Sequence, residues 1–374
     1  MSKRILLMAR DPGGANAIMP LVPELILKGY RVLLYGKDIA LQCYQERGLA
    51  GQDISLLITD INIETWVDFL EHEKPDFIIT GTSGDDFSER YLWKAARKVG
   101  IPTFAILDQW MNYGIRFSSY IPREQERYQF NKVHPYLPER ILVMDDWARQ
   151  GMINDGVEAE RILISGQPHF DFLLSLKENI TPTQIADYRC KLGSTEKEFL
   201  ITYISEPLSK DYQEAVSFWG YDEHSICREI LSTLSEINAT EQSPIRFIVK
   251  QHPRDDQESY ASLIEEFGSM NIDVLRSADT TALLMASDMV CGISSMLLLE
   301  AVLYGCPVMS VQIGLKRERP LILAQKGVLH PIKTKEELKQ VLQPILLENC
   351  LPEVKWQITP GAVERVILYM EEYL

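Results

Sequence analysis

Short apolar runs alternate with amphipathic stretches from the first residues onward, and this alternation constrains the fold more than any other feature of the chain. Most segments between the runs carry apolar residues at helical spacing, as in Trp66-Val67 and Phe69-Leu70. Strands that alternate with helices predict a parallel sheet covered by helices on both faces. The predicted strands of the first half are Ile5–Ala9, Val32–Tyr35, Ser55–Ile58, Phe77–Thr80, Thr103–Leu107, Ile141–Met144 and Ile162–Ile164.

A second series of the same kind begins after Gly166-Gln167-Pro168. At 374 residues the chain is about twice a usual domain length. We therefore predict an α/β protein with two Rossmann-like domains, residues 1–168 and 169–358, and a C-terminal helix in residues 359–374 that packs back on the first domain. The second series has predicted strands at Phe199–Ile204, Arg246–Lys250, Ile272–Leu275, Met289–Cys291 and Pro307–Val311, with helices such as Ser225–Ile237 and Ser295–Tyr304.

Composition excludes several classes of protein. With 46% hydrophobic and 24% charged residues the sequence is that of a globular protein, and its formal charge of −15 disfavours nucleic acid and anionic lipid as partners. The 6 cysteines form no C-x-x-C pair, so neither zinc nor a disulfide framework is indicated. No signal peptide or transmembrane run is evident, which predicts a cytoplasmic protein and leaves peripheral membrane contact and oligomeric state open.

The stretch LMARDPGGANAI, residues 7–18, contains the adjacent glycines Gly13 and Gly14 after the first predicted strand. It lacks the three spaced glycines of the dinucleotide fingerprint. We expect a strand, a glycine turn and a helix starting near Ala15, whose free N–H groups would face a ligand above the sheet. A tight turn without a ligand is the alternative, because proline and glycine suit turns intrinsically.

The stretch FIVKQHPRDD, residues 247–256, places His252-Pro253 directly after a predicted buried strand. Ligands of open α/β sheets bind at this carboxyl edge. His252 is therefore a candidate ligand-binding residue, and the alternative is a loop histidine satisfied by backbone groups.

A further predicted strand, Met289–Cys291, runs into Ser294 and Ser295 at the start of a helix that carries Glu300. The serines would cap this helix and offer a pocket for a phosphate, and Glu300 could accept hydrogen bonds from a ribose diol. A serine pair is also an ordinary helix cap, and glutamate early in a helix complements the helix dipole.

Together, the His-Pro and Ser-Ser motifs resemble the nucleotide-binding half of GT-B glycosyltransferases, such as bacterial sialyltransferases, capsule Kdo transferases and CDP-glycerol phosphotransferases. The segment from Ser294 to Val308 is also similar to the S-S/G-x(4–5)-E-A-x(3)-G-x-P-V pattern of non-hydrolysing UDP-N-acetylglucosamine 2-epimerases. ISGQPHFD, residues 164–171, resembles the V-T-G-N-P-x-F-D that closes the first domain in these families. The resemblance implies a GT-B fold with a cleft between two domains, onto which Gly13 and Gly14 would face.

Sugar transfer also requires a base, which in this fold comes from the first domain. The candidates at predicted strand ends are Asp11, Asp85, Asp86 and Asp108, among which Asp11 ranks first because the neighbouring glycines permit close approach of an acceptor. In the second domain, Glu206 could form a hydrogen bond with a nucleobase or with a sugar hydroxyl. His134 and His169 are weaker candidates, and Lys316 to Arg319 could neutralise a phosphate.

The resemblance implies a metal-independent glycosyltransferase that takes a nucleotide sugar of the UDP or CMP/CDP type and an acceptor substrate, with no other cofactor. The epimerases carry a G-D-T-x-S/T motif where this chain reads Gly84-Asp85-Asp86-Phe87, and this difference ranks a 2-epimerase behind a transferase. A CDP-glycerol-type phosphotransferase and a GT-B-shaped protein that binds a nucleotide or sugar without turnover remain open as well.

Overall fold

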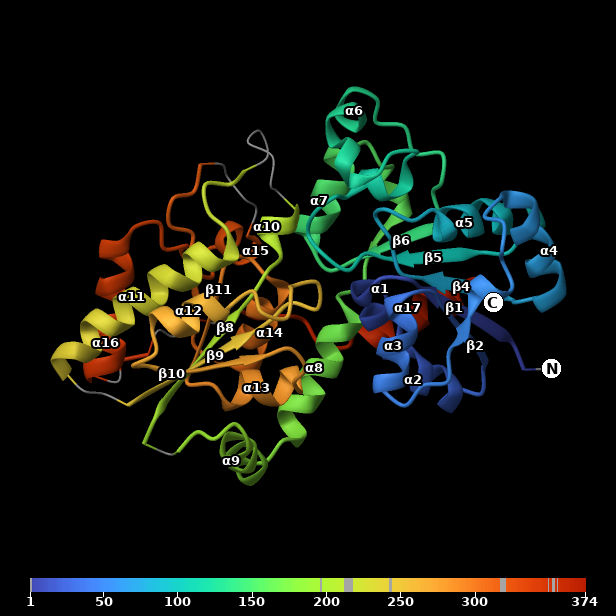
Figure 1. Ribbon diagram of the computed structural model, residues 1–374. Coiled ribbons are helices and arrows are strands. Elements are labelled where there is room, and N and C mark those ends of the chain that lie inside the picture. Colours follow the sequence, from blue (N-terminus) through green and yellow to red (C-terminus); the bar gives the residue numbers. More distant parts are fainter. Residues whose placement is uncertain are drawn as a thin grey trace. The chain divides into compact units, whose positions relative to one another are not determined.

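The computed structural model describes residues 2–195, 197–211, 218–241, 244–316, 321–348, 350–351, 354 and 356–374. The chain forms two compact units (Figure 1). Unit 1 comprises Met1–Phe172 and Ile358–Leu374, and unit 2 comprises Leu173–Gln357. Helix α8 (Pro168–Asn179) carries the chain from the first unit into the second.

Unit 1 is built on a 7-stranded sheet in the order β3-β2-β1-β4-β5-β6-β7, and every neighbouring pair is parallel. Apart from Arg4, Thr80 and Thr103, the residues of the central strands are apolar, because both faces of the sheet are buried. The strands are β1 (Arg4–Ala9), β2 (Arg31–Gly36), β3 (Gln52–Asp53), β4 (Phe77–Thr80), β5 (Thr103–Ile106), β6 (Arg140–Val143) and β7 (Ile162–Ile164).

Alternate residues of β1 belong to different cores. Ile5 and Leu7 pack with α1, α2, α3 and α17, whereas Leu6 and Met8 pack with α4 and α5 on the opposite face. The helices of unit 1 are α1 (Pro12–Ile18), α2 (Leu21–Leu27), α3 (Ile39–Glu46), α4 (Ile63–Glu73), α5 (Ser88–Val99), α6 (Gln125–Phe130), α7 (Asp146–Asn154) and α17 (Ala362–Glu371), with 3-10 turns η1 (Ile54–Leu56), η2 (Gly114–Phe117), η3 (Pro122–Glu124) and η4 (Ala159–Arg161).

The predicted strand Ser55–Ile58 is wrong. The strand pairing in this region is limited to β3, and residues 54–56 form the 3-10 turn η1. The Asp53 carboxylate accepts hydrogen bonds from both the N–H and the hydroxyl of Ser55 and thereby turns the chain out of the sheet. Ile54 and Ile58 still reach the core, which explains why the run is apolar.

Helix α17 belongs to unit 1, where Val366, Ile367 and Met370 lie in the same core as α1 and α2. Its start is fixed by Asp171, whose carboxylate accepts hydrogen bonds from the N–H groups of Gly361 and Val363, both at 2.9 Å. The chain thus returns to unit 1 over its last residues.

Unit 2 is built on a 5-stranded parallel sheet in the order β10-β9-β8-β11-β12. Its strands are β8 (Phe199–Ile204), β9 (Ile245–Lys250), β10 (Asn271–Leu275), β11 (Met289–Gly292) and β12 (Val308–Ser310). Its helices are α9 (Pro182–Lys191), α10 (Leu208–Asp211), α11 (Glu223–Glu241), α12 (Ala261–Glu266), α13 (Thr280–Ala286), α14 (Met296–Tyr304), α15 (Ile322–Gln325) and α16 (Lys335–Glu348).

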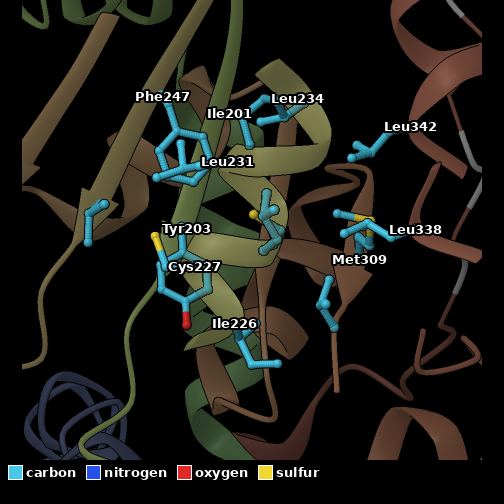
Figure 2. Close-up of a cluster of buried hydrophobic side chains, with 14 of the residues drawn as sticks. Ile201, Tyr203, Ile226, Cys227, Leu231, Leu234, Phe247, Met309, Leu338 and Leu342 are labelled. Carbon is cyan, nitrogen blue, oxygen red and sulfur yellow. The ribbon is translucent and has the colours of Figure 1, made fainter. Parts of the chain in front are cut away.

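The larger core of unit 2 lies between the sheet and helices α11 and α16. Figure 2 shows Ile226 and Leu231 of α11 in this core with Phe247 of β9, and Leu338 of α16 near Met309 of β12. A smaller cluster on the opposite face joins α9 and α13 to the sheet. The two parallel sheets confirm the predicted α/β class. Among the described residues no helix has the length and apolarity to cross a bilayer.

Candidate functional site

In unit 1 the strand order reverses between β1 and β4, and the segments that follow these strands meet at this point. β1 ends at Ala9 and leads into Asp11, while β4 ends at Thr80 and leads into Ser83. The Ser83 hydroxyl donates a hydrogen bond of 2.7 Å to Asp11 Oδ2. Such a switch point at the carboxyl edge is where open α/β sheets bind ligands. The first-ranked catalytic candidate therefore lies at the position that the topology favours.

The glycine pair lies within helix α1, so the expected turn before a helix at Ala15 is wrong. The helix begins at Pro12, because proline is well suited to the first helical position and the extended Asp11 stands at its N-cap. A Cβ on Gly14 would lie 3.1 Å from the Cα of Gly81, and a Cβ on Gly13 would overlap the Asp108 carboxylate. The two glycines thus allow the first turn of α1 to pack against the segments after β4 and β5.

Arg10 holds several carboxylates at this edge of unit 1. Its guanidinium lies 2.7 Å from Asp38, 2.5 Å from Asp85 and 3.2 Å from Asp11. Asp85, a candidate base, is therefore in an ion pair, with its side chain 57% exposed.

Asp86 is held in a different way from Asp85. It forms an ion pair of 2.7 Å with Lys37 and accepts a hydrogen bond from the Ser88 N–H at the start of α5. Burial acts to raise its pKa, but the bonds from Lys37 and Ser88 outweigh it and hold the pKa of Asp86 below its ordinary value. A carboxylate stabilised in this way is a weak proton acceptor near neutral pH.

Asp11 has the opposite tendency. Burial raises the pKa of the Asp11 carboxyl above its ordinary value, although the Ser83 hydroxyl and Arg10 act to lower it. A raised pKa brings a carboxylate closer to the range in which it accepts a proton efficiently. Asp11, the first-ranked of the four predicted carboxylates, therefore lies in surroundings that suit a base.

Glu89, on the first turn of α5, is a buried carboxyl that was not among the residues predicted from the sequence. Its Oε2 accepts the Ser83 N–H at 2.5 Å, and its Oε1 is buried without a hydrogen-bond partner among the described residues. Burial raises the pKa of Glu89 to about 8, with smaller contributions from Asp11 and Asp86 in the same direction. Its spacing from Leu92, Trp93 and Ala96 places it on the buried face of the helix, which is a signal in the sequence.

Asp108 and Arg116 form a buried ion pair of 2.9 Å beside this edge, and the Arg116 guanidinium also donates to the Thr82 hydroxyl. Asp108 is therefore a charged partner of an arginine that was likewise not predicted.

The two histidines that were weaker candidates contact other groups. His134 Nε2 is 2.8 Å from the Tyr128 hydroxyl, and His169 Nδ1 is 3.4 Å from Arg47. Burial lowers the pKa of His134.

The strand order of unit 2 reverses between β8 and β11, and the residues that follow these strands are joined there. Glu206, which follows β8, accepts hydrogen bonds from both the N–H and the hydroxyl of Ser294, which follows β11. Ser295 is the N-cap of α14, and its hydroxyl accepts from the Leu297 N–H at 3.2 Å. Glu300 lies further along α14 and is partly exposed. Glu206, Ser294 and Ser295 are thus grouped at the switch point of this sheet.

His252 follows β9, the strand next to β8, and its loop is fixed by hydrogen bonds. Its N–H donates to Asp255 Oδ2 at 2.9 Å, and the Ser205 hydroxyl after β8 donates to the same oxygen at 2.7 Å. The Arg254 N–H donates to His252 Nδ1 at 3.1 Å. Because Nδ1 is an acceptor, the neutral ring carries its proton on Nε2 and can donate from that atom.

Asp255 was not identified from the sequence as a site residue. It is 5% exposed, and it ties the loop after β9 to the loop after β8 through Ser205, whose oxygen also accepts from the Tyr260 hydroxyl at 2.6 Å.

Of the basic cluster Lys316 to Arg319, the structure describes only Lys316. The Lys316 N–H donates to the Trp219 carbonyl, and residues 317–319 lie outside the described residues. In the described part of the chain, no three His, Cys, Asp or Glu side chains are grouped so that they could hold a metal ion.

Comparison with known proteins identifies the fold. No protein-family model and no curated protein matches the sequence. Solved structures match over nearly its whole length. UDP-GlcNAc 2-epimerase from Neisseria meningitidis, bound to UDP-GlcNAc, has a TM-score of 0.65 at 15% identity, covering 99% of this chain and 93% of that one. UDP-GlcNAc 2-epimerase from Methanocaldococcus jannaschii has a TM-score of 0.67 at 14% identity, covering 99% and 100%.

Anabaena HepE in complex with UDP and glucose also matches, with a TM-score of 0.56 at 14% identity over 93% of this chain and 90% of that one. At these identities the similarity establishes the fold. The chain has the GT-B fold of the UDP-GlcNAc 2-epimerases, with parallel sheets of 7 and 5 strands in its two domains. This confirms the resemblance and the fold class that the motifs predicted.

Proposed function

We propose that the chain is an enzyme that acts on a nucleotide sugar and binds the nucleotide at the carboxyl edge of the unit 2 sheet. The observation that carries this proposal is the grouping of Glu206, Ser294 and Ser295 at the switch point of that sheet, next to the fixed His252 loop. Solved structures with this fold include one UDP-GlcNAc 2-epimerase bound to UDP-GlcNAc and another in complex with UDP-GlcNAc and UDP. The α14 N-terminus and the Nε2–H of His252 would supply donors to phosphate oxygens.

The favoured reaction is 2-epimerisation of a nucleotide sugar, which the sequence motifs ranked behind glycosyl transfer. The solved structures that match over the full chain include several UDP-GlcNAc 2-epimerases, and this favours the epimerase. Inversion at carbon 2 requires a group that removes the proton there and a group that returns one to the opposite face. In unit 1, Asp11 and Glu89 are carboxyls with raised pKa values that suit such roles.

Glycosyl transfer is the second candidate, and a difference in sequence favours it. The G-D-T-x-S/T motif of the epimerases is replaced here by Gly84-Asp85-Asp86-Phe87, and Asp85 and Asp86 are held in ion pairs with Arg10 and Lys37. In a transferase, Asp11 would take the proton of the acceptor hydroxyl. Both reactions use the same nucleotide site and differ in what happens at the sugar.

The two candidates are separated by one experiment in deuterium oxide. The protein is incubated with UDP-GlcNAc without an acceptor and followed by proton NMR. An epimerase is expected to form UDP-N-acetylmannosamine and to lose the carbon 2 proton signal, because the returning proton comes from solvent. UDP-GlcNAc that binds but remains unchanged would support the transferase instead.

A thermal-shift series with UDP, CMP, CDP, GDP and ADP tests the nucleotide site itself. A ligand that binds only the folded protein at 100-fold over its Kd stabilises the fold by about 2.7 kcal/mol. We expect the nucleotides that carry one particular nucleobase to raise the melting temperature more than the other nucleotides do. No shift with any of these nucleotides, and none with UDP-GlcNAc, would contradict the proposal.

A further inference from the structure

Three side chains form a continuous series of contacts that runs inward from the carboxyl edge of unit 1. The Ser83 hydroxyl donates to Asp11 Oδ2 at 2.7 Å, and the Ser83 N–H donates to Glu89 Oε2 at 2.5 Å. The Asp11 side chain is 36% exposed, whereas Ser83 and Glu89 are each 1% exposed. Of these three side chains, Asp11 can reach a ligand, and Glu89 contacts Ser83 behind it.

Glu89 is buried beside arginines that bind other groups. Arg90, the next residue, donates to four backbone carbonyls, and Arg116 donates to Asp108 and to Thr82. Among the described residues no cation forms an ion pair with Glu89, and its Oε1 has no hydrogen-bond partner. A buried carboxylate without a cation is unfavourable, so this arrangement favours the neutral acid.

The charges around Glu89 differ in sign, but their sum also favours the neutral acid. Burial raises the pKa of Glu89 to about 8, and two nearby aspartates act in the same direction. The bond from the Ser83 N–H and the charge of Arg116 act to lower it. Below about pH 8 the Asp11 carboxyl therefore has a neutral neighbour in Glu89. The charged or titratable groups that face Glu89 are Asp11, Asp86, Arg90, Arg116 and Tyr44, and the other charged groups that face Asp11 are Arg10, Asp85 and Asp108.

We propose that Glu89 is a positioning residue for the proposed reaction: by accepting the Ser83 N–H, it holds the Ser83 hydroxyl on the carboxylate of the proposed base, Asp11. This inference rests on the proposed function and assigns how Glu89 contributes to it. Because the acid is neutral, it fixes Ser83 without placing a second negative charge next to Asp11. The hydrogen bond from Ser83 favours the ionised form of Asp11, which is the form that accepts a proton.

The test is a carbon-13 NMR titration of the Asp11 carboxyl in protein labelled at aspartate, with the signal assigned by its loss in Asp11→Asn. Ser83→Ala removes the hydroxyl, and Glu89→Met removes the acceptor of the Ser83 N–H. We expect both substitutions to raise the pKa of Asp11, because its ionised form loses a hydrogen bond. Glu89→Gln keeps a neutral oxygen acceptor, so the pKa of Asp11 is expected to stay near that of the wild type.

Steady-state kinetics with UDP-GlcNAc test whether this positioning serves turnover. We expect kcat to fall about tenfold in Glu89→Met, equivalent to the loss of one hydrogen bond to a charged group. KM should change little, because Glu89 is too deeply buried to contact a ligand. The acidic limb of the kcat/KM profile should move to higher pH in Glu89→Met and in Ser83→Ala, and Glu89→Gln should recover most of the lost kcat.

Glu223→Met is the matched control. Glu223 lies on the first turn of α11, is 1% exposed, and accepts the Ser209 N–H at 2.8 Å. The substitution thus removes a similar buried anchor in unit 2, and it is expected to leave the pKa of Asp11 unchanged.

The direction of the change in the pKa of Asp11 decides the inference. A fall in Glu89→Met and Glu89→Gln would show that Glu89 acts as a negative charge and would overturn the proposal, as would equal pKa values in all forms of the protein. Ser83→Ala and Glu89→Gln decide the question if Glu89→Met does not fold. If UDP-GlcNAc is not turned over, the proposed epimerisation fails and the role of Glu89 in it fails as well, while the titration still shows whether Glu89 acts on Asp11 through Ser83.

Discussion

The carboxyl edge of each sheet contains a carboxylate that is hydrogen-bonded to a serine, but different residues surround the two pairs. In each unit a carboxylate that follows the first central strand accepts a hydrogen bond from a serine across the point where the strand order reverses. The pairs are Asp11 with Ser83 in unit 1 and Glu206 with Ser294 in unit 2. The common topology brings these residue types together because parallel strands end at the same edge.

The surroundings give the two pairs different properties. In unit 1, Asp11 shares Arg10 with two other carboxylates, and the neighbouring Ser83 N–H is given to the buried Glu89. In unit 2, the Glu206–Ser294 pair adjoins hydrogen-bond donors. A fixed loop holds one of them, His252, and the N-terminus of α14 supplies others. Under the proposed function, we assign proton transfer to the unit 1 edge and nucleotide binding to the unit 2 edge.

The substitution Asp11→Asn is expected to have the largest effect, because it removes the proposed base of unit 1. Asparagine keeps an oxygen acceptor for the Ser83 hydroxyl but cannot take a proton. Loss of a general base typically lowers the rate by about 10²–10⁴-fold. We therefore expect kcat on the substrate identified by NMR to fall by about that factor while the Kd for UDP stays the same, measured by steady-state kinetics and calorimetry.

Asp38→Asn provides the control for this substitution. Asp38 also binds Arg10, at 2.7 Å, but its side chain is about half exposed and forms no bond to Ser83 among the described residues. Its loss is expected to leave kcat nearly unchanged, because exposed ion pairs contribute little. Equal losses in the two variants would show that the charge balance around Arg10, and not a base at Asp11, controls turnover.

The second prediction concerns the stability of the fold and its dependence on pH. Burial raises the pKa of Glu89 from 4.5 to about 8, so the folded protein keeps a proton that the unfolded chain releases between these values. The contribution of Glu89 to the free energy of unfolding is then fully present below about pH 4.5 and is lost as the pH rises toward 8. Between pH 5 and pH 8 the loss due to this group is on the order of 3 kcal/mol.

Glu89→Gln removes this titration. The free energy of unfolding of this variant is therefore expected to fall less between pH 5 and pH 8 than that of the wild type. Urea unfolding at pH 5, 6.5 and 8 measures the difference. Glu64→Gln on the exposed part of α4 is the control and should follow the wild type. Parallel pH profiles for wild type and Glu89→Gln would mean that Glu89 is not held as a neutral acid.

Most of the fold could be predicted because the signals for strands and helices are local. β4, β8 and β9 lie within one residue of their predicted limits, since each is a short buried run. The run at Ser55–Ile58 has the pattern of a strand without being one, because apolarity records burial and not pairing. The start of α1 was predicted too late because glycines suggest a turn when the nearby chain that requires them is unknown.

The candidate site was predictable only in part, because its contacts join distant segments. Glu206 and Ser294 were each identified, but their bond depends on β8 and β11 being neighbours, which local patterns do not contain. Glu89 and Asp255 were missed for the same reason. A buried carboxyl is recognised by its partners, and these lie elsewhere in the sequence.

The third prediction tests the packing that distinguishes unit 1. A Cβ on Gly81 would lie 2.6 Å from the Cα of Gly14, a backbone atom that cannot move without shifting α1. Overpacking of this kind costs about 1–3 kcal/mol, so Gly81→Ala is expected to lower the free energy of unfolding by that amount. Gly268→Ala in unit 2 is the control, because its Cβ would meet only ordinary contacts. A Gly81→Ala variant as stable as the control would show that α1 and the segment after β4 are not tightly packed.

The smallest expected effect lies in unit 2. His252→Ala and Ser295→Ala are each expected to raise the Kd for the nucleotide about tenfold, because each removes a hydrogen bond to a charged phosphate. The melting temperature of the free His252→Ala variant should change little, since the loop after β9 is held mainly by Asp255 and Ser205 and not by the imidazole. Ser295→Ala also removes the N-cap of α14 and is expected to cost about 0.5–2 kcal/mol of stability. His72→Ala on α4 of unit 1, whose side chain is 84% exposed, serves as the control for loss of a histidine. If both unit 2 variants bind nucleotide normally while Asp11→Asn does not, the nucleotide binds at the unit 1 edge and the roles assigned to the two edges are reversed.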